Sequence, residues 1–121
     1  MNSEDLKRRT KLFAIAAIHF AKTLPKNDEG FAIKKQLIRC ATSVGANYRA
    51  VCRARSSADF ISKIAIVEEE ADETCFWLEV LEESGMVSKE STAKLYDEAT
   101  QLTAIFSASR KTSRSNSDKY K

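Results

Sequence analysis

Acidic residues and one histidine are the residue types in this chain that could hold a metal ion. Glu68–Glu73 contains five acids in six positions, and His19 is the only histidine. Di-iron bundles hold their metals with inward carboxylates and with Glu-x-x-His pairs on two helices. Three residues before His19, where the Glu of such a pair would stand, this chain has Ala16. Most of the acids of Glu68–Glu73 are also expected to lie off the inner face of their helix. We therefore expect no metal site and interpret the acids as a solvated or ion-paired face.

Nucleophilic catalysis finds no support in the residue pattern either. No hydroxyl or thiol has a histidine base within a motif, and no glycine-rich phosphate loop is present. Cys40, Cys52 and Cys75 show no CxxC spacing, so we expect reduced, packed thiols rather than a disulfide or a metal site. The sequence thus predicts a protein that is not an enzyme and uses no cofactor.

Lysines and arginines cluster near the start of the chain, in the middle and at the end. Such clusters are what contacts to nucleic-acid phosphates require. Aromatic residues do not alternate with the basic ones, so any binding would depend on shape and backbone charge rather than on base stacking. The candidate nucleic-acid-binding residues are Lys7, Arg8, Arg9, Lys11, Lys35, Arg39, Arg49 and Arg53.

An alternative for these basic residues stays open. The arginines of the middle cluster would be unavailable to a nucleic acid if Glu69, Glu73 and neighbouring acids bind them in ion pairs. Only the first cluster and the chain end would then be free. The net charge of +3 does not decide between the two.

The elements that must position these residues are helices, because the chain holds only three glycines and one proline. Its 121 residues suffice for one domain. Capping residues and breakers predict helices from Ser3 to about Leu24, from Asp28 to about Arg55, from Asp59 to Gly85, and from Ser88 past Phe106. The short loops predict an all-α, antiparallel, up-and-down four-helix bundle over residues 1–110. Residues 111–121 have no apolar periodicity and are predicted to form a disordered basic tail.

Each predicted helix carries an apolar seam with steps of three and four residues, the spacing that keeps one face toward a core. The third helix has the most regular seam, which is Phe60, Ile64, Val67, Ala71, Thr74, Leu78 and Leu81. The seam of the first helix is Leu6, Phe13, Ala17, Phe20 and Leu24. The seam of the second helix is Ile33, Leu37, Cys40, Val44, Asn47 and Val51, and that of the fourth is Leu95, Leu102 and Phe106.

A second set of apolar residues lies on the opposite side of the first and third helices. Exposed apolar surface on a small protein usually marks a contact site, so we expect a homo-oligomer. Scattered exposure, with the fourth helix over one patch, is the alternative. The candidate interface residues are Ile15, Ile18, Ile66, Glu69, Glu73, Phe76, Trp77 and Val80.

Targeting signals are absent from the sequence pattern. The charged start of the chain lacks the apolar core of a signal peptide, and no apolar run approaches the roughly 20 residues of a membrane span. We expect a cytoplasmic protein with no membrane association.

Three segments together resemble a known family. They are QLIRCATSVGANYRA at Gln36–Ala50, SSADFISK at Ser56–Lys63, and EEADETCFWLEVLEESG, which ends at Gly85. The chain resembles the four-helix-bundle proteins encoded in intervening sequences of bacterial 23S ribosomal RNA. That family includes the accessory variability determinant of diversity-generating retroelements. The residues that carry the resemblance are Arg39, Ser43, Asn47, Glu70, Glu73 and Trp77.

The resemblance implies a non-enzymatic bundle that forms a ring-like homopentamer. It also implies a basic surface suited to RNA or to a nucleic-acid-bound partner such as a reverse transcriptase. The usual Asn-Ile-Ala-Glu-Gly ending of the second-helix motif is replaced here by Asn47–Val51. This change makes the segment more basic, and only Arg39, Arg49 and Arg53 carry over as candidate contacts.

The leading hypothesis is an oligomeric accessory protein that binds structured RNA, a DNA–RNA complex or a reverse-transcriptase/RNA complex through basic surface residues. The competing hypothesis is a protein-interaction scaffold, whose outer helix faces serve self-assembly and partner binding without nucleic acid.

Overall fold

Helices make up most of the part of the chain that the structure describes, which is residues 1–119. In that part the computed structural model contains α1 (Ser3–Ala21), α2 (Asp28–Val51), α3 (Ser57–Glu83) and α4 (Lys89–Lys119). Residues 1–119 contain no strand, so the predicted all-helical fold with four helices is confirmed. A search of the same residues finds no helix with the length and apolar character that a membrane crossing needs.

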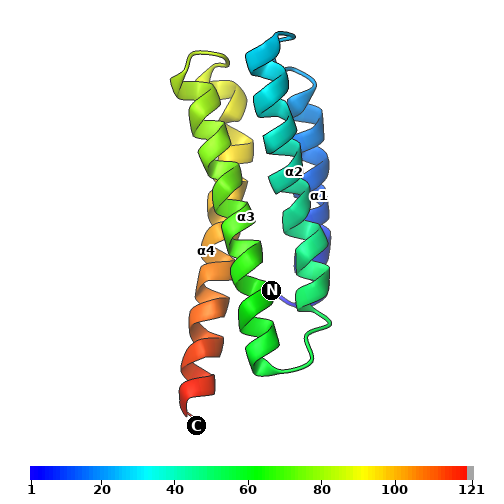
Figure 1. Ribbon diagram of the computed structural model, residues 1–121, viewed down its shortest axis with the longest axis vertical. Helices are drawn as coiled ribbons and strands as arrows, with labels where there is room; N and C mark the ends of the chain where they lie inside the picture. Colours follow the sequence, from blue (N-terminus) through cyan, green and yellow to red (C-terminus); the bar gives the residue numbers. More distant parts are fainter. Residues whose placement is uncertain (120–121) are drawn as a thin grey trace.

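The four helices stand side by side along one long axis, and the chain reverses direction at each loop (Figure 1). Close backbone approaches join α1 to α2, α2 to α3 and α3 to α4, and a looser one joins α1 to α4. Within residues 1–119, α1 has no such approach to α3, and α2 has none to α4. Helices α1 and α3 therefore occupy diagonal corners of the bundle, and their outer faces point in opposite directions.

Side-chain caps define where the helices begin, and at α4 the Ser88 hydroxyl accepts a hydrogen bond from the Ser91 amide at 3.2 Å. Asn2 caps α1 by accepting a hydrogen bond from the Asp5 amide at 2.8 Å, and the Asp5 carboxylate accepts one from the Asn2 amide. Ser3 was the predicted cap, but Asn2 has the acid three residues on that completes a capping box. Asn27 caps α2 and Ser56 caps α3 in the same way, each accepting from the third residue after it.

The predicted seams form the core. On α3 every seam residue from Ile64 to Leu81 is buried, and Phe60 at its start is half-buried. The core also takes in Tyr48, whose ring packs on Phe106 with centroids 5.6 Å apart, and it includes Ala99. The seam pattern missed these two, because a helix with two neighbours buries a stripe wider than a single seam.

The end of α4 differs from the prediction. Residues 111–119, expected to be disordered, continue the helix to Lys119, while Tyr120 and Lys121 lie outside the described residues. No glycine or proline interrupts this segment. Arg110 also joins it to α3, since its Nε lies 2.5 Å from the Glu68 carboxylate. Most residues of this segment are weak helix formers, so the extension depends on the absence of helix breakers and on the Arg110 ion pair, which anchors its start.

Gly30 sets how closely the first loop packs over the start of α2. A Cβ atom at this position would lie 1.9 Å from the carbonyl oxygen of Pro25, which is backbone and cannot rotate away. Gly30→Ala is expected to lower the free energy of unfolding by about 1–3 kcal/mol. Urea unfolding followed by circular dichroism measures this loss.

The reverse change at a neighbouring exposed residue serves as control for Gly30. Ala32→Gly alters only helix propensity and is expected to cost about 0.5–1 kcal/mol. A Gly30→Ala protein as stable as the unaltered chain would contradict the close packing of the loop.

Candidate nucleic-acid interface

Four basic residues line one hollow on the surface. Lys7 and Lys11 come from α1, Arg49 comes from α2, and Arg53 lies in the turn just past the end of α2. Small side chains and a glycine line the rest of this hollow, which has a volume of about 470 Å³. We call it the basic groove, and its remaining lining residues are Ala14, Thr42, Gly45 and Ala46.

The basic groove exists because α1 and α2 approach closely at Gly45. A Cβ atom there would lie 3.3 Å from the carbonyl oxygen of Thr10. Thr10 is itself buried, and its hydroxyl donates to the Leu6 carbonyl at 2.7 Å. Lys7 and Lys11 are four positions apart on α1, so they project from the same side one turn apart, and Arg53 follows Arg49 just past the end of α2. Close helices with small residues between them therefore leave a channel flanked by cations.

These cations are largely free of acidic partners. Lys11, Arg49 and Arg53 are exposed, and none of them has an ion pair within residues 1–119. Lys7 lies 3.2 Å from Glu4, but the Glu4 side chain is 79% exposed, so solvent screens that pair and it contributes little. The basic groove is therefore positively charged and open to an anion.

The other candidate cations lie elsewhere. Arg9 is ion-paired to Glu98 of α4 at 2.7 Å and also donates to Gln101. The hydrogen bond to Glu98 and the charge of that carboxylate hold the pKa of Arg9 above its usual value, against the lowering effect of burial. Lys35 and Arg8 are exposed but do not line the groove. The structure thus gathers half of the eight predicted residues into one site.

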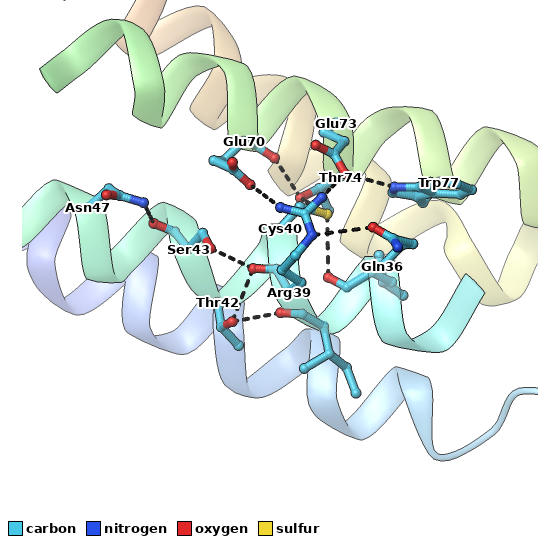
Figure 2. Close-up of polar contacts among 12 residues, drawn as sticks. Gln36, Arg39, Cys40, Thr42, Ser43, Asn47, Glu70, Glu73, Thr74 and Trp77 are labelled. Carbon is cyan, nitrogen blue, oxygen red and sulfur yellow. Dashed lines mark hydrogen bonds and ion pairs between the residues drawn. The ribbon is translucent and has the colours of Figure 1, made fainter. Parts of the chain in front are cut away.

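Arg39 lies in a polar network between α2 and α3 (Figure 2). Its guanidinium contacts Glu70 at 3.3 Å, forms a closer ion pair with Glu73, and donates to Gln36. The Trp77 indole donates to the same Glu73 carboxylate at 3.0 Å. These contacts fix the register of α2 against α3 and occupy Arg39 within the chain.

The question left open by the sequence is therefore answered residue by residue. Arg39 is bound by acids of α3, as the ion-pair alternative predicted. Arg49 and Arg53 are not, because Arg49 lies on the side of α2 that faces α1 and Arg53 follows the end of α2 beside the same groove. The sequence did not separate Arg39 from Arg49 and Arg53, whereas the structure gives them different neighbours.

The acids of Glu68–Glu73 do not converge on a metal site. Glu68 binds Arg110, while Glu70 and Glu73 bind Arg39. His19 is exposed on α1, which is diagonal to α3. Within residues 1–119 no three histidine, cysteine or acidic side chains come together as metal ligands.

The candidate interface residues divide into exposed and half-buried groups. Exposed on their helices are Ile15, Ile18, Ile66, Glu69 and Phe76, whereas Glu73, Trp77 and Val80 are half-buried. Leu12 is 58% exposed and was not among the candidates. Its place three residues before Ile15 on the same side of α1 was the signal that could have found it.

Comparison with known proteins identifies the family. A model of the family described as 23S rRNA-intervening sequence protein matches residues 4–108, which is most of the chain. The chain belongs to this family. Its matched part covers α1, α2 and α3 except for the first residue of α1, and it ends within α4. The resemblance inferred from Gln36–Ala50 and the two later segments is confirmed at the level of the 23S rRNA-intervening sequence proteins.

A solved structure from a related protein shares the fold. It is a crystal structure from Bacteroides thetaiotaomicron VPI-5482, described as a protein with unknown function from the S23 ribosomal protein family. The two chains are 32% identical, and their structures match with a TM-score of 0.83. The match covers 92% of this chain and 99% of that one. No curated protein matches the chain.

The Arg39 network predicts how stability depends on pH. Burial raises the pKa of Glu70 above its usual value, and Arg39 acts against that rise. In Arg39→Met the pKa of Glu70 should rise further, so its ionised form destabilises the fold as pH rises through that pKa. We expect a loss of about 1 kcal/mol near neutral pH, since Arg39 is partly exposed and screened. The loss should shrink at acidic pH, as pH falls through the raised pKa of Glu70 and this carboxylate takes up a proton.

Urea unfolding at neutral pH and at acidic pH measures this difference. Arg49→Met removes the same charge from a residue without an ion pair, and its effect should stay within about 0.5 kcal/mol at both. An Arg39→Met loss that does not change with pH would contradict the role assigned to Glu70.

Proposed function

We propose that this protein is a non-enzymatic nucleic-acid-binding protein that holds the phosphate backbone of structured RNA in the basic groove. The observation that carries the proposal is the convergence of Lys7, Lys11, Arg49 and Arg53 on one open hollow, where the exposed Glu4 beside Lys7 is the one acid paired with them within residues 1–119. Phosphate oxygens are the partners that such a cluster of ammonium and guanidinium groups would bind.

The lining of the basic groove favours backbone contacts over base contacts. No aromatic side chain lines it, so it offers no platform on which a base could stack. Its walls are helices whose small residues, Ala14, Gly45 and Ala46, let a strand approach the helix surface. We infer that the protein recognises the shape and charge of a folded RNA rather than its sequence.

The description of the family names 23S rRNA, and for this reason we propose RNA as the nucleic acid that is bound. On the resemblance noted from the sequence, we further propose that the antiparallel bundle assembles as a ring-like homopentamer. On the same ground a reverse transcriptase bound to RNA is a candidate partner, as for the accessory determinant of diversity-generating retroelements.

A second candidate function is a protein-interaction scaffold that binds no nucleic acid. It is favoured by the exposure of Leu12, Phe76 and Ile66, which are 58%, 52% and 43% exposed. Under this function the outer faces would serve self-assembly and a protein partner, and charge reversal in the basic groove would leave partner binding intact.

Charge reversal in the groove tests the leading proposal. Arg49→Glu with Arg53→Glu should weaken binding to a fluorescently labelled RNA hairpin by more than about tenfold, because two phosphate contacts become repulsive. Arg49→Ala alone should reduce the slope of log affinity against log salt by about 1. Fluorescence anisotropy over about 50 mM to 200 mM salt measures both.

The matched control carries the same change in net charge at the other end of the bundle. Lys26→Glu with Lys89→Glu alters two exposed residues near the first and third loops, which lie together at the end away from the groove (Figure 1). This control should bind nearly as well as the unaltered chain. Equal losses in both variants, or binding that salt does not weaken, would overturn the proposal in favour of the scaffold.

A further inference from the structure

Two apolar patches on the surface have nothing over them within the chain. The first, which we call the α1 patch, is Leu12, Ile15 and Ile18. The second, the α3 patch, is the exposed Phe76 ring, set edge-on against the half-buried Trp77 at 4.9 Å, and Ile66 is a further exposed residue about 15 Å away along α3. Exposed apolar clusters of this kind mark contact sites on soluble proteins.

The two patches cannot cover each other in one molecule. Helices α1 and α3 lie at diagonal corners of the bundle, and their outer faces point in opposite directions (Figure 1). Each patch therefore needs a surface from another molecule.

The shapes of the two patches are complementary. Beside the α1 patch, the loose contact between α1 and α4 leaves a groove of about 610 Å³. Its apolar lining residues are Leu12, Phe13, Ala16, Phe20 and Leu95. The α3 patch instead presents an aromatic ring that is 52% exposed. A protruding ring on one face and an apolar hollow on the other can fit together.

The charges around the patches are complementary as well. From Leu6 to Asn27 the chain has no acidic residue, and from Ile64 to Ser88 it has no basic residue. Arg8 and Lys22 flank the α1 patch along its helix, while Glu69 and Asp72 flank Phe76. All four are exposed, and none of them has an ion pair within residues 1–119.

On α2, Arg39 is already bound by Glu70 and Glu73 inside the bundle. The other exposed cation of that part of α2, Lys35, has one large exposed apolar side chain near it, Phe31. The α1 patch offers three exposed apolar side chains beside unpaired positive charge, which favours it as the partner of the α3 patch.

We infer that the α1 patch of one copy of this chain binds the α3 patch of a second copy. Such a contact is heterologous, because each copy contributes a different face. The partner is a second copy because one chain carries both halves of the complementary pair, in shape and in charge. The inference rests on the self-association proposed above and names the surfaces that carry it.

Mixing two variants tests this pairing. Leu12→Glu with Ile15→Glu places two acids in the α1 patch, opposite the acids of α3, and Phe76→Glu removes the ring from the α3 patch. All three positions are exposed, so the fold should survive, and circular dichroism checks that it does. By light scattering after gel filtration, each variant alone should have the mass of one chain, 13.5 kDa.

An equimolar mixture of the two variants should form a dimer with one chain of each kind. The first variant keeps an intact α3 patch and the second keeps an intact α1 patch, so one good contact remains. Ala104→Glu, an exposed change on α4, should keep the oligomer of the unaltered chain. Phe76→Ala, which adds no charge, should also weaken association, by at least about tenfold, as loss of a buried aromatic anchor does.

Three results would overturn the inference in distinguishable ways. An unaltered chain that stays monomeric at high concentration would remove self-association itself. An oligomer that persists in either patch variant would show that other surfaces carry it. Two monomeric variants that do not associate on mixing would show that the α1 patch and the α3 patch do not bind each other. None of these results bears on RNA binding through Arg49 and Arg53, which the anisotropy titration measures separately.

Discussion

The three-and-four spacing of apolar residues is the constraint on which the rest of this structure depends. It fixes the rotation of each helix about its axis, because the seam must face the core. Once Val67, Ala71 and Thr74 are buried, the direction of every other residue on α3 is determined, including Phe76 toward solvent. The distribution of charge over the surface is thus a consequence of how the core packs.

The charges at the helix boundaries follow from these rotations. Ion pairs join three pairs of neighbouring helices. Arg9 of α1 binds Glu98 of α4, Arg39 of α2 binds Glu70 and Glu73 of α3, and Glu68 of α3 binds Arg110 of α4. Within the described residues the α1–α2 boundary has none, and there Lys7 and Lys11 face Arg49 and Arg53 across the groove. Like charges held this close repel one another, and the packing of Gly45 on Thr10 must offset that repulsion. A bound polyanion would relieve it, which links the architecture of this boundary to the proposed function.

The sequence predicted the fold more completely than the site. Helix positions and the buried seams follow from local patterns, and the structure differs mainly where Arg110 finds Glu68 and extends α4. The basic groove depends on which side of α2 faces α1, and no pattern within one helix contains that information. Arg39 and Arg49 therefore looked equivalent in the sequence, although one is ion-paired and the other is exposed. Leu12 was missed although its spacing of three residues from Ile15 places it on the same side of α1.

The diagonal placement of α1 and α3 has a consequence for the size of any assembly. When a molecule joins its neighbour through two different faces, each contact repeats the same rotation and translation. The assembly closes only if a whole number of those rotations makes a full circle and the translation along the axis is zero; otherwise it continues as a helical fibre. The angle between the outer faces of α1 and α3, set by side chains deep in the bundle, therefore decides whether growth stops. A core substitution that twists one helix by a few degrees could convert a finite particle into an open-ended one without touching the surface.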